Sequence, residues 1–438
     1  MRSSSPGPAR GGAKSTGPAV GPAATPQGLR TDTPAEVIRR LVDAWRKERE
    51  TARRRSQEER AEIPWKERIE RGLAAADLTV DETFPSPGQR VIVVVRSGDP
   101  RFTRERMRVR PGDPVVLFHH DPAESTALHA VVERWRGPGL GLALDDDLPD
   151  AFEDRPFRLE REAPEATFNR GDRALARLEK AHGELGQLVA VGYGLGTVQR
   201  VDHGAVPLFD TSLDAAQNEA VQHALGTIPF ALVHGPPGTG KTRCLVEIIR
   251  QMVARGERVL AVAPSNVAVD NLVERLVAAN VPALRLGHPA RVLPEVEVHT
   301  LAYRLDQHEA TRLTRGWIQE ANALKRRTEA QAARGTGDRQ ARREAFAEAR
   351  RLLKDARAHL RRVEAAMLSQ APVVCATLTG AWEAWSGLSR DDGAGFGVVV
   401  LDEATQAVDP LAWIPLAMAP RAILAGDPHQ LAPTVIDA

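Results

Sequence analysis

Cysteine is nearly absent from this sequence, and Cys244 and Cys375 are the only two among 438 residues. Two cysteines exclude a disulfide framework and a cysteine-based zinc site, and they suit a reducing compartment. We therefore expect a cytoplasmic protein in which both thiols are small, buried packing groups.

Long apolar runs and an excess of one charge are missing as well. No apolar run approaches the roughly 18 residues of a membrane span, which argues against a membrane protein. The net charge is only +1, from 59 basic and 58 acidic residues. A globally basic nucleic-acid-binding protein is therefore not indicated, and any binding of nucleic acid must come from a local patch.

The first 31 residues lack acidic side chains and the apolar segment of a signal peptide. Because they are rich in Ser, Pro, Gly and Ala, we predict a disordered tail at 1–31, or a start codon assigned too far upstream. After it, Thr33 and Glu36 form a predicted capping box around Pro34, which opens a long charged helix. We predict a helical stalk over 32–74.

The pattern of residue types changes three times along the rest of the chain. Residues 75–166 hold short β-type runs broken by Gly, Pro and Asp, a pattern typical of a small antiparallel barrel. A helix and linker are predicted at 167–210, with the helical stretch at 170–192. From 211 to 438, apolar strands alternate with helices, which predicts an α/β fold with a parallel sheet covered by helices on both faces.

One segment interrupts this alternation. Residues 304–368 are rich in Ala, Arg and Glu, with "RGTGD" at 334–338 as a natural turn. We predict a helical hairpin inserted in the α/β domain.

A phosphate-binding loop is indicated by "HGPPGTGKT" at 234–242, which fits G-x-x-x-x-G-K-[ST] between a predicted strand and a predicted helix. Its glycines let backbone N–H groups curl around phosphate oxygens, and the helix directs its positive end at them. Lys241 is expected to reach the β- and γ-phosphates of ATP, and Thr242 to bind Mg²⁺. The predicted nucleotide site consists of Gly235, Pro236, Pro237, Gly238, Thr239, Gly240, Lys241 and Thr242.

The second half of an ATPase site is indicated by "GVVVLDEATQA" at 397–407, where an apolar strand ends in two acids. We expect Asp402 to hold Mg²⁺ and Glu403 to orient or deprotonate the attacking water. With Lys241 and Gln430, these two residues form the predicted catalytic set.

Polar residues near other predicted strands complete the candidate site. Gln217 precedes the first strand, and its amide suits the edge of adenine. Ser265, Asn266 and Thr377 follow strands and suit contacts to a sugar–phosphate backbone, although such residues also cap helices and close turns. Gln430 follows the last strand in "GDPHQL", within expected reach of a γ-phosphate.

The motifs stand in a characteristic order: a glutamine before the first strand, then "GPPGTGKT", "PSNVAVDNL", "CAT", "DEATQA" and "GDPHQLAPTV". Over residues 34–438 the set resembles the superfamily 1B helicases related to the nonsense-mediated-decay helicase and the immunoglobulin mu-binding helicase. The resemblance implies a first RecA-like domain that carries an inserted β-barrel on a helical stalk and an inserted helical subdomain.

The resemblance also implies a function. We expect the N-terminal part of an ATP-dependent helicase or translocase that moves 5′-to-3′ on single-stranded DNA or RNA, with ATP and Mg²⁺ as cofactors. The family's second RecA-like domain, with its arginine fingers, is missing from this sequence. We therefore expect a fragment with very slow ATP hydrolysis and no duplex unwinding. The alternative is a module that binds nucleotide and nucleic acid without working as a motor.

Overall fold

The structure is a computed structural model, and it describes eight stretches of the chain. The predicted tail at 1–31 and four of the five residues of the predicted turn at 334–338 lie outside them. The described residues are 32–86, 90–144, 148–162, 165–202, 204–287, 291–334, 339–387 and 395–436.

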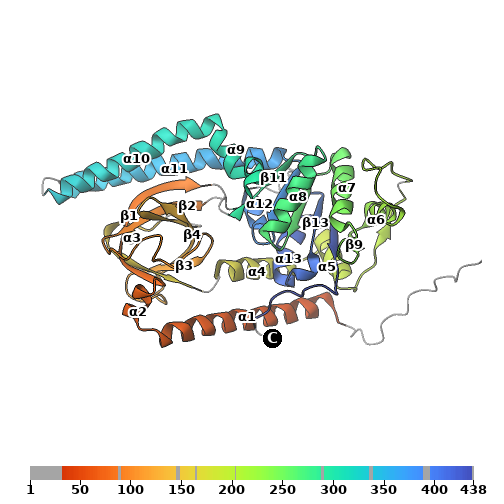
Figure 1. Cartoon of the computed structure of the whole chain (residues 1–438), viewed down its shortest axis with the longest axis horizontal. Helices are drawn as coiled ribbons and strands as arrows, with labels where there is room; N and C mark the ends of the chain where they lie inside the picture. The colour runs from red at the N-terminus through yellow and green to blue at the C-terminus, as the bar shows by residue number, and fades with distance from the viewer. Residues whose placement is uncertain are drawn as a thin grey trace, which may run out of the picture.

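The ATPase domain is built on one sheet of six parallel strands (Figure 1), which confirms the predicted fold class. The strands lie in the order β11-β12-β10-β13-β14-β9, and neighbours pair in parallel throughout. Their bounds are β9 Phe230–His234, β10 Val259–Ala263, β11 Ala283–Arg285, β12 Val373–Thr377, β13 Val398–Leu401 and β14 Ala422–Gly426.

Alternate strand residues face two separate cores, as the two-residue repeat of a strand requires. In β10, Val259 and Ala261 join the core under three helices, while Leu260 and Val262 join the core on the opposite face. All five β10 residues are buried, which is why the strand is apolar without interruption. The first core is covered by α6 Ala215–Gly226, α7 Lys241–Ala254 and α8 Asn266–Ala278; the second includes α5 Gly183–Gly192, α12 Ala381–Gly387 and α13 Asp409–Leu416.

The barrel is a closed antiparallel sheet with the strand order β1-β2-β5-β4-β3-β6. Its interior is filled by apolar side chains such as Leu78, Val93 and Leu117, each fully buried. The strands are β1 Ala74–Ser86, β2 Arg90–Ser97, β3 Pro114–Phe118, β4 Leu128–Arg136, β5 Gly139–Leu144 and β6 Phe157–Arg161, with α3 Asp150–Asp154 before the last.

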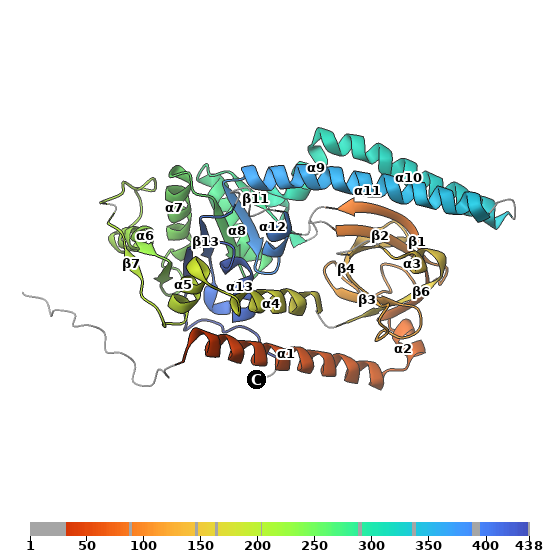
Figure 2. The same ribbon diagram turned by 180° about the vertical axis from the view of Figure 1, so that it is seen from behind.

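Two helices connect the barrel to the ATPase domain, and the long one is α1 Pro34–Glu62 (Figure 2). It begins with the predicted capping box, since Thr33 and Glu36 bond each other's backbone N–H. The second is α4 Glu165–Leu178, and Trp45 of α1 donates from Nε1 to the Phe168 carbonyl at 3.2 Å. The short helix α2 Trp65–Glu70 leads from α1 into the barrel.

The predicted helical stretch at 170–192 is wrong in one respect, because it consists of two helices. The first, α4, ends at Leu178, and α5 starts at Gly183. Gly183 has a φ of +58°, a left-handed conformation in which the chain turns between the two helices.

The inserted hairpin lies between β11 and β12 in the sequence and runs along the barrel in space (Figures 1 and 2). It consists of α10 Glu309–Ala333 and α11 Arg339–Gln370, preceded by α9 Leu301–Gln307. Lys325 of α10 pairs with Glu153 of α3 at 2.5 Å, and both side chains are about nine-tenths buried. The hairpin is therefore packed against the barrel as well as inserted in the ATPase domain.

The minor elements among the described residues are the short strands β7 Gln199–Arg200 and β8 Thr227–Ile228, and the 3₁₀ helices Pro294–His299 and Ala404–Gln406. Among the described helices, none combines the length and the hydropathy needed to cross a membrane.

Candidate nucleotide and nucleic-acid site

The predicted site residues gather at one edge of the parallel sheet. Because all six strands run in the same direction, their carboxyl ends meet at that edge, the usual place for ligands in open α/β sheets. The carboxyl ends of β9, β10, β12, β13 and β14 and the segments that follow them bring together the predicted residues that lie beyond 234 in the sequence; Thr377 is itself the last residue of β12.

The phosphate loop has the backbone that the motif requires. Gly238 and Gly240 have φ values of +80° and +83°, which a residue with a side chain rarely adopts. The ammonium of Lys241 donates to the carbonyl oxygens of Gly235 at 2.5 Å and Pro236 at 3.1 Å. Two carbonyl oxygens of the loop itself therefore hold this cation at the N-terminus of α7.

Thr242 and Asp402 are in direct contact. The Thr242 hydroxyl donates to Asp402 Oδ2 at 2.8 Å, across 160 residues of sequence. Asp402 is 4% exposed, and its other oxygen accepts the backbone N–H of Glu403 at 2.9 Å. A hydroxyl and a carboxylate together offer the oxygen ligands that Mg²⁺ prefers, and Mg²⁺ fills its remaining positions with waters and phosphate oxygens. The residues present thus fit the predicted metal.

Glu403 is held in a strained backbone conformation beside this pair. Its φ is +52°, which is uncommon for a residue with a side chain and is often found at functional sites. Burial raises the pKa of Glu403 above its usual value, the charge of Asp402 raises it further, and Lys241 lowers it. A carboxyl group with a raised pKa is a better proton acceptor, as a general base requires.

Gln217 lies against the phosphate loop, but both ends of its amide are used within the protein. Its Nε2 donates to the Thr239 carbonyl at 3.0 Å, and its Oε1 accepts the backbone N–H of Asp214 at 3.0 Å. A Cβ at Gly240 would come within 2.5 Å of Gln217 Nε2, so the glycine is needed for this approach. The contact to adenine stays a prediction; the described contact links α6 to the loop.

Gln430 is tied to Asp427 after β14. Its Nε2 donates to Asp427 Oδ2 at 3.1 Å, and the His429 backbone N–H donates to Oδ1 at 3.0 Å. These hydrogen bonds keep the pKa of Asp427 below its usual value. His234, the last residue of β9, lies 3.6 Å from the same carboxylate. Gln430 is thus held in the loop after β14, and β14 pairs with β9, the strand that leads into the phosphate loop.

The three predicted nucleic-acid residues all have structural partners. Ser265 caps α8 by accepting the Ala268 N–H at 3.1 Å, and Thr377 Oγ1 accepts the Gly380 N–H at 3.1 Å. Asn266 accepts a hydrogen bond from Arg285 at 2.9 Å. Ser265 thus caps a helix and Thr377 closes a turn, the roles that we named as the alternative to nucleic-acid binding. The contacts of all three residues to nucleic acid stay predictions.

Sequence reasoning missed Arg285 and Asp270, which form a buried ion pair behind Asn266. Asp270 lies four residues after Asn266 in "SNVAVDN", and Arg285 ends the strand in "ALRLG". An arginine inside an apolar strand was the available signal, because a buried cation requires an anionic partner.

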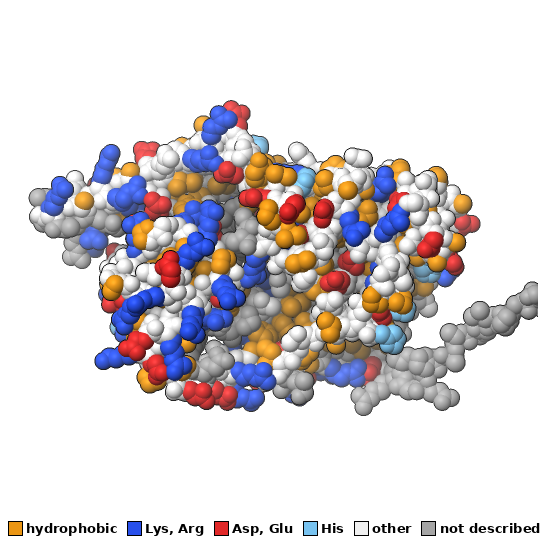
Figure 3. Space-filling view, in the orientation of Figure 1, with side chains coloured by type: hydrophobic (Ala, Val, Ile, Leu, Met, Phe, Trp, Pro, Cys, Tyr) orange, Lys and Arg blue, Asp and Glu red, His pale blue; other side chains and the backbone are white. Residues whose placement is uncertain are grey.

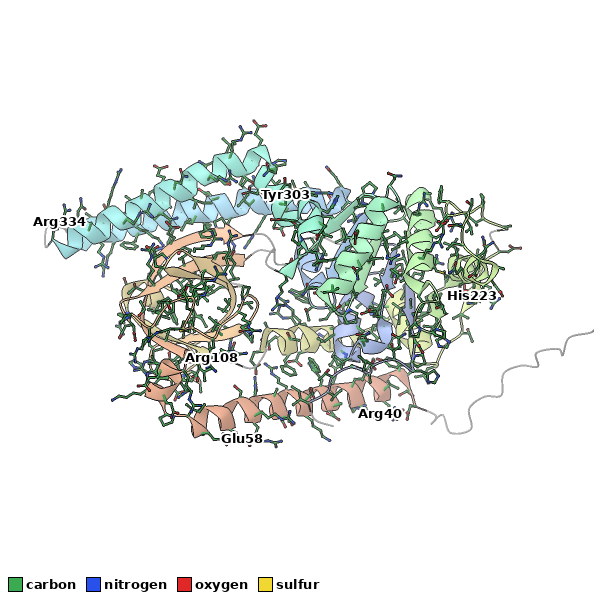
Figure 4. The ribbon with its side chains drawn as sticks, viewed as in Figure 1. Arg40, Glu58, Arg108, His223, Tyr303 and Arg334 are labelled. Carbon is green, nitrogen blue, oxygen red and sulfur yellow. The ribbon has the colours of Figure 1, made fainter. Side chains whose placement is uncertain are left out.

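A basic cavity lies on the surface of the barrel, where Figure 3 shows many Lys and Arg side chains. Its volume is about 1000 Å³, and Figure 4 places Arg108 near α4. The guanidinium of Arg291, from the ATPase domain, lies against Gly112 beside this cavity. The lining residues include Arg104, Arg108, Arg110, Arg134, Trp135 and Arg161, with Asp113 as the acidic member.

Comparison with known proteins finds relatives that are similar to this chain over its ATPase domain and, for some, over most of its length. A family profile described as an AAA domain matches residues 212–438. The mouse "DNA-binding protein SMUBP-2" is 35% identical over 401 residues, which cover 88% of this chain and 39% of the mouse protein. The fission yeast (Schizosaccharomyces pombe) "DNA polymerase alpha-associated DNA helicase A" is 40% identical over 53% of this chain and 34% of its own length.

A third relative is "ATP-dependent helicase NAM7" of Saccharomyces cerevisiae, 34% identical over 53% of this chain and 21% of its own length. The chain thus spans well under half the length of these three relatives. A family profile that covers the whole ATPase domain and a relative that aligns through the barrel agree with the fold, and the chain belongs to the superfamily 1B helicases, a group of AAA-type P-loop ATPases.

Proposed function

We propose that this chain binds ATP with Mg²⁺ and is part of an ATP-dependent helicase or translocase that acts on single-stranded nucleic acid. The observation that supports this most is the 2.8 Å contact between Thr242 and Asp402, with Lys241 in the adjoining loop. It joins the two halves of an ATPase motif that are distant in the sequence. Movement in the 5′-to-3′ direction rests on the family resemblance alone.

Each residue has a role that its environment supports. Lys241 neutralises phosphate charge, and Thr242 with Asp402 would hold Mg²⁺, which supplies charge stabilisation on the phosphates when bound. Glu403 accepts a proton from the attacking water, and Gln430 orients that water or the terminal phosphate. The buried free thiols of Cys244 and Cys375 support the cytoplasm as the expected compartment.

Two surfaces support binding of a single strand. Ser265, Asn266 and Thr377 lie at the ligand-binding edge of the sheet, and the basic cavity of the barrel offers arginines for phosphates. Relatives carry names that include DNA binding and DNA helicase, so we propose DNA as the first substrate to test, with RNA beside it.

Calorimetry with ATP and Mg²⁺ tests the nucleotide site. Lys241→Ala should weaken ATP binding by about tenfold or more, because the variant has no charged hydrogen-bond donor for the phosphates. Lys354→Ala, on the exposed side of α11, is the matched control and should bind as the wild type does. Equal affinity in the wild type and Lys241→Ala would reject the site.

Steady-state ATP hydrolysis with and without oligothymidylate tests the motor. We expect this chain to hydrolyse ATP very slowly, to do so faster when the single strand is present, and to lose that acceleration in Glu403→Gln while ATP binding is retained. Hydrolysis that single strands leave unchanged, despite binding of both ligands, would favour the module that only binds them.

A further inference from the structure

Arg285 is a buried cation at the end of the edge strand β11, and it is 0% exposed. Its Nε donates to Asp270 Oδ1 at 2.7 Å, its Nη1 donates to the Leu286 carbonyl, and its Nη2 donates to Asn266 Oδ1 at 2.9 Å. A buried charge is tolerated only when its partners are in place, so this guanidinium is bonded in three directions.

The surroundings fix its position. The second oxygen of Asp270 accepts the backbone N–H of Leu293 at 2.9 Å, so the carboxylate cannot turn away. Gly287 has a φ of +140°, and a Cβ at this residue would come within 2.8 Å of Arg285 Nη1. The backbone after β11 therefore curls closely around the guanidinium.

This arrangement decides how the Asn266 amide is oriented. A guanidinium donates and never accepts, so the amide oxygen of Asn266 must face Arg285. The two N–H groups of the amide then point away from the ion pair. Within the part of the chain that the structure describes, they have no acceptor, and Asn266 is half-buried at the first position of α8. Two donors are thus directed outward at the ligand-binding edge.

We propose that Arg285 is a positioning residue that holds the Asn266 amide with its N–H groups toward the phosphate oxygens of a bound single strand. This rests on the proposed function, and it adds the orientation of the contact and the residue that sets it. Asp270 and the Leu286 carbonyl already compensate the buried charge with partners from the core. The third hydrogen bond holds the amide oxygen of Asn266 toward Arg285. The N–H donors of that amide are then the groups presented to a ligand, and donors favour an anionic ligand.

The sharpest test replaces Asn266 in two ways. Asn266→Asp keeps an oxygen for Arg285 and adds a favourable negative charge in the first turn of α8, so it should fold at least as well as the wild type. Its outward atom becomes a carboxylate oxygen, which repels phosphate. Asn266→Ala removes the donors without adding charge.

Fluorescence anisotropy with labelled oligothymidylate and oligouridylate at low salt is the readout. We expect Asn266→Ala to bind about tenfold more weakly than the wild type, the size of one hydrogen bond to a charged group. Asn266→Asp should bind more weakly still, on the order of threefold below Asn266→Ala, because like charges then meet. Binding by Asn266→Asp that equals or exceeds that of Asn266→Ala would overturn the proposed orientation.

A double-mutant cycle tests the part played by Arg285. Arg285→Lys keeps the charge beside Asp270, but a single ammonium cannot span both partners. We expect it to weaken binding about as much as Asn266→Ala does, and to have no further effect when Asn266 is already alanine. An equal loss of affinity in both backgrounds would show that Arg285 acts otherwise and would overturn the inference.

Two further outcomes separate this inference from the proposed function. Absence of binding by the wild-type chain to either oligonucleotide would overturn both. Normal wild-type binding with the wrong order of the Asn266 variants overturns the inference alone. If Arg285→Lys fails to fold, the two Asn266 variants decide the matter, since neither removes the buried ion pair.

Discussion

The hydroxyl of Thr242, at the start of α7, donates to the carboxylate of Asp402, the residue directly after β13, over 2.8 Å. Strand β14 lies between β13 and β9, the strand that precedes the phosphate loop. The contact therefore spans the carboxyl edge of the sheet and brings both predicted Mg²⁺ ligands together.

Removing this hydroxyl should make ATP binding less sensitive to Mg²⁺. We expect Thr242→Ala to lose about tenfold in affinity when Mg²⁺ is present, the size of one interaction with a charged group, and to lose little when a chelator has removed the metal. Thr242→Ser keeps the hydroxyl and should behave like the wild type. Calorimetry with and without Mg²⁺ measures the ATP affinity of both variants. An equal loss of affinity in Thr242→Ala under the two conditions would contradict the assignment of Thr242 as a Mg²⁺ ligand.

Neutralising Glu403 should stabilise the fold at neutral pH. Burial and the charge of Asp402 raise its pKa above the ordinary value of 4.5. A carboxyl group with a raised pKa contributes stability that is fully present below its unfolded pKa and is lost as the pH rises through the folded pKa.

Glu403→Gln should therefore unfold at a higher temperature than the wild type at pH 7, and the difference should shrink toward zero near pH 4, below the ordinary value of 4.5. Thermal unfolding across this pH range checks the sign. Glu274→Gln, an exposed change on α8, is the control and should show no such trend. If Glu403→Gln were less stable than the wild type at pH 7, the negative charge of Glu403 would not be unfavourable to folding.

The basic cavity of the barrel should set the salt dependence of nucleic-acid binding. Arg104, Arg108 and Arg110 are exposed, and within the described residues none of them makes an ion pair, so all three are available for phosphates. The triple alanine variant should make the slope of log K against log salt shallower by about 0.7 for each phosphate that is no longer neutralised, up to about 2 in total.

Arg39→Ala is the matched control, because Arg39 is exposed on α1 away from this cavity. Anisotropy titrations over a range of salt concentrations give the slopes. An unchanged slope in the triple variant would exclude the cavity from the nucleic-acid path.

Two helical glycines should respond to alanine with opposite signs. At Gly171 of α4, a Cβ would lie 2.6 Å from the ring of Trp45, whose Nε1 is bonded to the Phe168 carbonyl. The clash should cost about 1–3 kcal/mol and exceed the gain in helix propensity. At Gly316 of α10 nothing lies within 4 Å, so alanine should stabilise the protein by about 0.5–1 kcal/mol. Denaturant unfolding compares the two; destabilisation at both positions would contradict the reasoning.

Local patterns in the sequence were enough for the elements and for the phosphate loop. The strands of the sheet are short apolar runs that stop at polar residues, and their burial on both faces is what makes those runs continuous. The capping box of Thr33 and Glu36 and the glycines of the loop act within a few residues. Such signals depend on backbone geometry and on residues close by in the sequence, so they can be interpreted from the sequence without knowledge of the tertiary structure.

Tertiary structure alone decided which distant polar groups meet. Gln217 bonds the Thr239 carbonyl, Arg285 bonds Asn266, and α10 pairs with α3 through Lys325 and Glu153. Each of these pairings depends on the order of strands in a sheet or on how an insertion packs, and no local spacing encodes that order. The sequence by itself thus determined the fold class and the phosphate loop, while the sheet determined which side chains point into the site and which are held by a neighbour.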